Sequence, residues 1–272
     1  MSQLFVWFTV LAYVFSLSLY LYFLYTGKEV MGRTATVLLF LGLACHYLAL
    51  LGRAKATHSV PYHDLQGSLS LFGWLLAVTY LCLEIYHRQR TVGAFVVPII
   101  LAFFSASYLI PVHAAKPTTP HGVVFALHIT LSLLAYAGFA LSCVLSVMYL
   151  AEERVLRMRK FSDVVWRLPS LELLERMAHT SVLVGLVTIA VGTALGFVAV
   201  DRQTGPQPAH PYFDPKYVVT IVVLVFYAVY YLLARTAAWR GARASILCVF
   251  NFLLVLLSFT VVNYISTTHR YF

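Results

Sequence analysis

Charged residues are scarce in this chain. They make up 11% of its 272 residues, whereas 61% are hydrophobic. A soluble globular domain carries about 25% charged residues, so the composition excludes a soluble enzyme or binding module. Only ten residues are Asp or Glu, and Glu84 alone lies inside a long apolar run, near one end of it. Ion-coupled pumps usually place carboxylates at mid-membrane, which argues against that class.

Several chemical signatures are also missing. The four cysteines lie within apolar runs and form neither a C-x-x-C pair nor a C-x-x-C-H haem-attachment motif, which disfavours thiol redox chemistry and covalent haem. The sequence contains no H-E-x-x-H and no phosphate-binding glycine loop. The best-known zinc protease and nucleotide-binding signatures are therefore absent. We expect no bond-making catalysis, so the chain is predicted not to be an enzyme.

Long hydrocarbon runs are what the sequence does contain. A bilayer core needs about 20 apolar residues per helix, and backbone groups in lipid must be satisfied internally. We therefore predict an all-α integral membrane protein, an eight-transmembrane-helix bundle forming one polytopic membrane domain over residues 1–272. The predicted spans are 4–25, 34–51, 67–86, 93–110, 121–150, 178–200, 216–235 and 243–265.

The positive charges predict the topology. With the N-terminus outside, six of the 19 Lys and Arg residues fall in outer loops and the other 13 fall inside. This positive-inside bias places both termini on the outer, periplasmic side. The net charge of +9 is then a topology signal and an attraction to membrane lipid, and nucleic acid is not expected as a partner. We predict a multi-pass protein of the bacterial inner (cytoplasmic) membrane.

Two further segments carry structural predictions. The inner segment 151–177 has apolar residues at helical spacing, which fits an interfacial helix broken at Pro169. A solvated linker with helical turns fits equally well. In span 178–200, Gly192 and Gly196 are four residues apart, a spacing that allows close helix packing.

Histidines gather on one side of this topology. Six of the ten lie on the outer side, and His46 and His128 lie in the outer portions of their helices. Only His87 and His179 fall on the other side. One-sided neutral imidazoles suit a metal or haem site at a membrane face. The six are His58, His63, His113, His121, His210 and His269.

His128 and His269 are the favoured ligand pair. His121 and His128 share a helix face but lie about 10 Å apart along the axis, so they cannot ligate one iron together. His269 follows the last span and lies at the outer rim. Haem suits the pattern better than a bare ion, because two imidazoles complete a low-spin iron and porphyrin prefers apolar, aromatic walls. Trp74, Tyr212 and Phe213 are candidate wall residues.

Haem propionates would need cations on the outer side of the membrane, where the haem is predicted to lie. The outer cations that could pair with haem propionates are Arg53, Lys55, Arg202, Lys216 and Arg270.

His46 is an intramembrane ionisable residue and hence a functional candidate, as a second-site or relay residue. A hydrogen-bonded packing role fits it equally well.

Five stretches, in order, resemble the cytochrome c assembly family, the CcsA- and CcmC-type haem-handling membrane proteins, and especially its HemX/YpjD-like branch. The first, LACHYLALLGR, precedes a histidine-led helix with an Ala-Tyr pair, a leucine-rich entry with a glycine-bearing helix, the counterpart of a W-D-P-K segment, and a terminal histidine-tyrosine element. These occupy residues 43–53, 126–153, 168–196, 213–235 and 268–271.

The resemblance implies a function. In the family, two external histidines flank a tryptophan-rich loop and ligate haem, and these match His128 and His269. It implies non-covalent haem b at the outer face, with Tyr212, Phe213 and Asp214 lining the platform. Partners would be cytochrome c maturation proteins or a haem-synthesis enzyme, and the role would be cytochrome c maturation or haem homeostasis.

The chain departs from the family pattern at two places. Pro211-Tyr212-Phe213-Asp214 stands where the family has tryptophans before the aspartate, and Leu232 stands where some members carry a transmembrane histidine. These departures favour one alternative, a cofactor-free regulatory or scaffold protein in haem synthesis or ion homeostasis. The other alternative is a metal or small-solute transporter with the outer histidines as its capture site.

Overall fold

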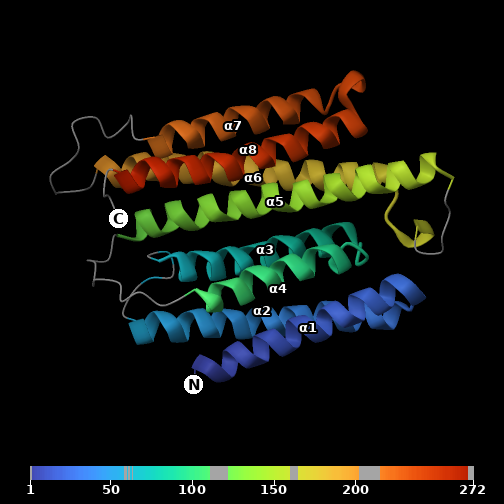
Figure 1. Cartoon of the computed structure of the whole chain (residues 1–272), viewed down its shortest axis with the longest axis horizontal. Coiled ribbons are helices and arrows are strands. Elements are labelled where there is room, and N and C mark those ends of the chain that lie inside the picture. The colour runs from blue at the N-terminus through green and yellow to red at the C-terminus, as the bar shows by residue number, and fades with distance from the viewer. Residues whose placement is uncertain are drawn as a thin grey trace. The chain divides into compact units, whose positions relative to one another are not determined.

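The computed structural model describes residues 2–57, 60, 62, 64–110, 122–159, 165–201 and 215–268 (Figure 1). Within these ranges it describes no side chain at 2, 57, 200, 201, 215–217 or 259–268. The described residues form helices, turns and short connections, and no strand occurs among them. The all-α prediction is therefore confirmed for this part of the chain.

Among the described residues, eight α-helices follow one another in the order that the apolar runs predicted, and two short 3₁₀ helices, η1 and η3, lie between them. They are α1 (Ser2–Thr26), α2 (Glu29–Thr57), α3 (Leu65–His87), α4 (Gly93–Leu109), α5 (Val123–Arg157), η1 (Val165–Arg167), α6 (Leu171–Asp201), α7 (Pro215–Leu233), η3 (Ala237–Trp239) and α8 (Ala242–Thr268).

Several helices run past the predicted apolar spans. α2 extends on both sides of 34–51, and α5 continues to Arg157 instead of ending near 150. Helical hydrogen bonds do not stop at the edge of the hydrocarbon, so polar residues at the ends stay helical. α5 also begins two residues later than predicted, because Gly122 lies outside the helix.

The described parts of 151–177 favour the linker interpretation over the interfacial helix. α5 ends at Arg157, one 3₁₀ turn spans Val165–Arg167, and α6 begins at Leu171. Arg159 has a left-handed backbone, with φ of 54°, and Pro169 precedes α6. Since proline disfavours helical backbone in the residue before it, Leu168 cannot readily join η1 to α6 as one helix.

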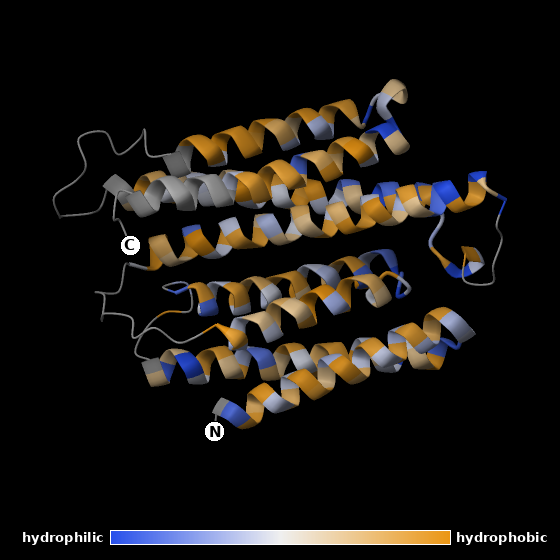
Figure 2. Cartoon of the chain, viewed as in Figure 1, coloured by the Kyte–Doolittle hydropathy of each residue, from blue (hydrophilic) through white to orange (hydrophobic). Residues whose placement is uncertain are grey.

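In the part of the chain that the structure describes, five helices are long and apolar enough to cross a bilayer, namely α1, α2, α3, α5 and α6. α4 and the parts of α7 and α8 with described side chains are apolar but shorter. Apolar residues run along the helices, and hydrophilic residues gather at the turns between α3 and α4 and between α7 and α8 (Figure 2). The chain is a multi-pass membrane protein.

The chain divides into two compact units. Unit 1 comprises residues 1–120 and 155–173. Within it, α1 packs on α2 and α4, and α3 packs on α2 and α4, so the four helices close a ring. Tyr13, Tyr20, Tyr80 and Phe104 are fully buried inside it. The core of unit 1 therefore contains polar groups, the hydroxyls of its three buried tyrosines.

Unit 2 comprises residues 121–154 and 174–272. Its core draws on all four of its helices, with Phe139 from α5, Val182 from α6, Tyr227 from α7 and Cys248 from α8, each with no exposed surface. The Phe139 and Tyr227 rings stack in parallel, with centroids 3.7 Å apart. α7 packs directly on α8, and the turn that contains η3 connects the two helices.

Candidate functional site

His128 lies near the start of α5 and is held by the backbone of α6. Its Nδ1 lies 2.6 Å from the carbonyl oxygen of Gly192. A carbonyl oxygen can only accept, so Nδ1 carries the proton and donates it. In the neutral ring Nε2 is then the atom with the free lone pair, and it makes no hydrogen bond to any described residue.

Two glycines of α6 make room for side chains of α5, Gly196 for the His128 imidazole and Gly192 for Ser132 one turn further along. A Cβ at Gly196 would lie 2.8 Å from Cε1 and Nδ1 of His128, which is too close for any side chain. At Gly192 a Cβ would lie 3.2 Å from Oγ of Ser132, and that hydroxyl donates to the His128 carbonyl over 2.8 Å. The predicted close packing at Gly192 and Gly196 is confirmed, and it holds one histidine ring in a fixed orientation.

The same glycine pattern continues along the α5–α6 contact. A Cβ at Gly138 would lie 3.0 Å from the Ser181 carbonyl oxygen, and one at Gly185 would lie 2.5 Å from the Phe139 ring. Glycines at these positions let the two backbones approach closely. The His128 ring therefore belongs to a tightly packed helix pair and not to a loosely held surface.

His46 has a different environment, in unit 1. It is fully buried, with Nδ1 3.1 Å from the Tyr13 hydroxyl and Nε2 3.0 Å from Oγ of Ser70. The Phe104 ring lies against it, with ring centroids 4.5 Å apart. Because both ring nitrogens are hydrogen-bonded to neutral hydroxyls, the contacts are those of a packing residue. Its role at a second haem site stays a prediction.

Trp74 and Arg53 also use their polar atoms within unit 1. The Trp74 indole N–H donates to the Leu43 carbonyl over 3.1 Å, and its ring lies 5.7 Å from that of Tyr47. Arg53 forms a salt bridge with Asp64. Asp64 in turn caps α3 by accepting from the Gly67 N–H over 3.2 Å. The carboxylate thus already compensates the guanidinium that was a candidate partner for a propionate.

The other predicted site residues lie outside the described residues. They are His269, Tyr212, Phe213 and Asp214, with the remaining outer histidines His58, His63, His113, His121 and His210. Among the residues that are described, no group of three His, Cys, Asp or Glu side chains could hold a metal ion. Thus the described part of the site consists of one oriented imidazole.

A buried carboxylate cluster in unit 1 was not foreseen. Glu84 accepts hydrogen bonds from the hydroxyls of Tyr20, Tyr80 and Thr36, at 2.6, 2.5 and 2.5 Å. Arg90 approaches it to 3.9 Å. The three hydroxyl donors come from α1, α3 and α2, and Arg90 lies in the turn before α4. The only signal in the sequence was Glu84 itself within an apolar run, since its partners are ordinary tyrosines and a threonine.

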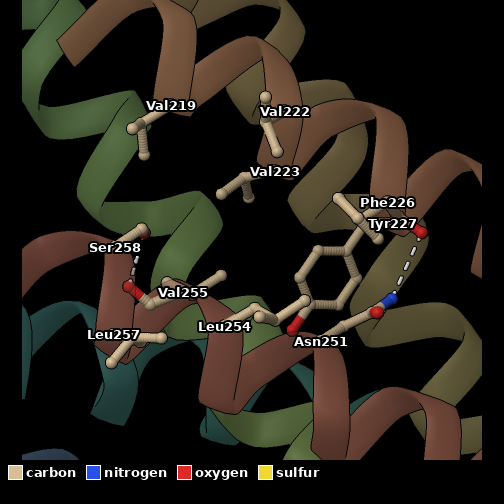
Figure 3. Close-up of a pocket in the computed structure, with 10 residues that line it drawn as sticks. All are labelled: Val219, Val222, Val223, Phe226, Tyr227, Asn251, Leu254, Val255, Leu257 and Ser258. Carbon is tan, nitrogen blue, oxygen red and sulfur yellow. Dashed lines mark hydrogen bonds between the residues drawn. The ribbon is translucent and has the colours of Figure 1, made fainter. Parts of the chain in front are cut away.

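An apolar pocket of about 280 Å³ lies between α7 and α8 (Figure 3). Valines and leucines line most of it, together with Phe226, Tyr227, Asn251 and Ser258. The Asn251 amide donates to the Phe226 carbonyl over 3.2 Å, and the Ser258 hydroxyl donates to the Val255 carbonyl over 2.7 Å. None of the described residues that line it is a histidine, and the pocket offers mainly hydrocarbon contact.

Residues 62–269 match the family model described as cytochrome C assembly protein. The matched range contains Trp74, His128, the segment 212–214 and His269, and it leaves out His46. It covers a little over half of unit 1 and nearly all of unit 2.

Curated relatives align over most of both chains. Protein HemX of Brevibacillus brevis is 25% identical over 91% of this chain and 94% of its own length. Protein HemX of Bacillus subtilis (strain 168) is 23% identical over 78% and 77%. Cytochrome c biogenesis protein CcsA of Prochlorococcus marinus (strain MIT 9215) is 23% identical over 80% and 78%. The helices and the oriented histidine of this chain agree with the family match. The chain therefore belongs to the cytochrome c assembly protein family, as the match over residues 62–269 shows.

Proposed function

We propose that this protein binds haem non-covalently at the outer membrane face and supports cytochrome c maturation or haem homeostasis. The observation that carries the proposal is the hydrogen bond from Nδ1 of His128 to the Gly192 carbonyl. Histidines that ligate metals usually donate their other ring N–H to a carbonyl or carboxylate, which fixes the tautomer and raises ligand basicity. His128 has this arrangement, and Nε2 is the nitrogen that remains to bind iron.

The donor chemistry of His128 fits haem b. In the neutral ring Nε2 carries the free lone pair, because Nδ1 donates to the Gly192 carbonyl. The ring packs against Gly196 and lies on a helix pair packed through glycines. His128 and His269 would hold the haem, and bound haem would supply an iron-centred redox couple tuned by these ligands. The chain's own residues would orient and retain the cofactor. We propose no bond-making catalysis by them.

His269 is the proposed second ligand, and Tyr212, Phe213 and Asp214 the proposed lining of the platform. The family match spans all four, and the resemblance assigns its external histidine to His269. His46 and Trp74 are not included in this site, because their polar atoms are engaged with Tyr13, Ser70 and Leu43.

The biological setting is proposed from the relatives. One group is named cytochrome c biogenesis protein CcsA, and another is named HemX, from Brevibacillus and Bacillus. A place in cytochrome c maturation or in haem homeostasis is consistent with both. Partners would be maturation proteins or a haem-synthesis enzyme.

We also propose that all eight α-helices cross a bacterial cytoplasmic membrane with both termini outside. The positive-inside distribution supports this. Fusion of a reporter that is active only outside the membrane, placed after Phe272, tests the C-terminus, and a fusion after Arg159 is the control. Activity at the first fusion and none at the second is expected. The reverse pattern would invert the topology and remove the outer haem site.

A haem spectrum tests the function directly. The detergent-purified protein is expected to show a Soret band or to acquire one when offered haem. The His128→Ala and His269→Ala variants should each lose the low-spin spectrum, whereas His179→Ala, a matched change in the same unit, should keep it. If the wild type binds no haem, or if His128→Ala retains an unchanged spectrum, the proposal is wrong. A haem-free protein would favour the regulatory alternative.

A further inference from the structure

The turn between α7 and α8 presents three arginines and no acid. Arg235, Arg240 and Arg243 are all exposed, and no Asp or Glu occurs in the sequence after Asp214. The turn is short and includes η3. Three guanidinium groups within nine residues, without a carboxylate among them, make a strongly basic surface that calls for an anionic partner.

This turn is anchored to the rest of unit 2. Gly241 has φ of 74°, and its N–H donates to the Glu175 carboxylate over 3.2 Å. A Cβ at Gly241 would lie 2.8 Å from the Tyr149 hydroxyl. The nearby carboxylate thus binds the backbone of the turn. Arg243 donates to the Ala238 carbonyl over 3.1 Å, which further fixes the turn.

Arg235 is oriented by an aromatic neighbour. It donates to the Tyr231 hydroxyl over 2.6 Å, and its guanidinium lies 4.5 Å from the centroid of that ring. His179 of α6 stacks on Tyr231, with centroids 4.7 Å apart. Since a fixed guanidinium loses less entropy on binding than a free one, the turn is prepared to receive an anion.

The start of α8 adds to the attraction. Arg243 is the second residue of this helix, and its first turn holds no acidic residue. The positive end of the helix dipole disfavours a cation there and favours an anion. A phosphate group placed before α8 would relieve this repulsion and meet the helix N-terminus.

The surroundings point to a lipid and not to a soluble anion. Trp239 is 38% exposed within the turn, and the exposed large apolar side chains nearest to it along the chain on the two helices, Leu232 and Ile246, are 65% and 58% exposed. Tryptophan prefers the membrane–water interface. A ligand here meets cations and hydrocarbon-facing residues side by side, which is the chemistry of an anionic phospholipid.

The pocket between α7 and α8 supplies a place for the lipid chain (Figure 3). Leu254 in its wall lies eleven residues after Arg243, three turns along the same face of α8 and about 16 Å away. One leaflet provides roughly 15 Å of hydrocarbon, half of the bilayer core. Phe250, which is 54% exposed, lies between them.

We infer that the arginine turn, residues 235–243, binds the phosphate of an anionic phospholipid whose acyl chain follows α8 into the α7–α8 pocket. The inference depends on these helices spanning the bilayer and not on the haem site, so the two proposals can fail separately.

Native mass spectrometry of the full chain tests the head-group contact. After delipidation the protein is titrated with palmitoyl-oleoyl phosphatidylglycerol or with phosphatidylcholine of the same chains. The wild type should retain phosphatidylglycerol preferentially. Each arginine removed should weaken this binding about fivefold, since a cation near the membrane surface contributes about 1 kcal/mol. The single variant Arg240→Gln therefore still tests the head-group contact if the triple variant Arg235→Gln, Arg240→Gln, Arg243→Gln does not fold.

The matched control removes three other exposed cations, Lys28→Gln, Arg33→Gln and Arg154→Gln, and should retain the lipid. Equal loss in this control would show general charge attraction and overturn the site, as would unchanged binding in Arg240→Gln. Displacement of the lipid by equimolar inorganic phosphate would make the ligand a free anion and overturn the lipid assignment.

Chain length tests the pocket. Dihexanoyl phosphatidylglycerol, whose chains are too short to reach Leu254, should bind more weakly to the wild type than the long-chain lipid. Val223→Phe, which fills the pocket, should weaken only the long-chain lipid. Equal binding of both lipids by the wild type would overturn the acyl-chain part of the proposal.

Discussion

A methyl group on Gly196 would lie 2.8 Å from Nδ1 of His128, the atom that donates to the Gly192 carbonyl. The His128 ring of α5 thus fills the space that a side chain at Gly196 of α6 would need. Gly196→Ala must rotate the imidazole or separate α5 from α6. We expect haem affinity to fall about tenfold to a hundredfold, the usual effect of losing an orienting contact of a metal ligand. Haem titration followed at the Soret band measures it.

Gly122→Ala is the matched control for this change, because a Cβ there would have no neighbour within 4 Å. It should leave the titration unchanged. Tight haem binding by a folded Gly196→Ala protein would show that the fixed ring orientation is not required for ligation.

His46→Ala should destabilise unit 1 and leave haem binding intact. The change removes two hydrogen bonds, to Tyr13 and Ser70, and leaves a cavity against Phe104. We expect a loss of about 2 kcal/mol or more in the free energy of unfolding, measured by denaturation in detergent. Leu48→Ala, at a 41% exposed position of the same helix, should cost much less. Loss of the haem spectrum in a folded His46→Ala protein would show that His46 takes part in haem binding.

Tyr20→Phe should destabilise the ring of helices in unit 1, whereas Tyr22→Phe should not. The Tyr20 hydroxyl donates to buried Glu84 over 2.6 Å, and Tyr22 is 44% exposed on the same helix. Removing one donor from a buried carboxylate costs about 1 kcal/mol or more. Thermal unfolding of the two variants makes the comparison. Equal midpoints would mean that the remaining donors to Glu84 suffice.

Arg167→Ala should loosen the end of α1. The Arg167 guanidinium donates to the Leu24 and Tyr25 carbonyls, which have no helical partner at the end of a helix. Loss of this cap should speed hydrogen exchange of the Gly27 amide, which donates to Phe23 over 2.8 Å, by about fivefold for each 1 kcal/mol lost. Arg159→Ala, an exposed change in the same connection, is the control. Unaltered exchange at Gly27 would show that water satisfies these carbonyls equally well.

Much of the architecture was readable from the sequence. Hydrocarbon runs of about 20 residues predict helices regardless of neighbours, because a bilayer leaves the backbone no other way to satisfy its polar groups. The eight helices appear in the predicted order for this reason. Their ends were less predictable, since Arg157 stays helical beyond the apolar run that marked α5.

The candidate site, too, was predicted only in part from the sequence. The sequence singled out His128 as a ligand and the Gly192–Gly196 pair as a packing motif, but it did not connect them. His128 and Gly192 are 64 residues apart, and only the packing of α5 on α6 brings the Gly192 carbonyl to Nδ1 of His128. Likewise His46 stood out as an intramembrane histidine, yet its hydroxyl partners Tyr13 and Ser70 come from two other helices.

What the sequence alone determined is therefore the set of helices, their order and the residue types that can bind haem, because hydropathy and side-chain chemistry are local properties. Tertiary structure decided which nitrogen of His128 is free, that both nitrogens of His46 are engaged, and that Glu84 joins three helices. Those outcomes depend on distances between segments remote along the chain, and close packing between helices sets such distances.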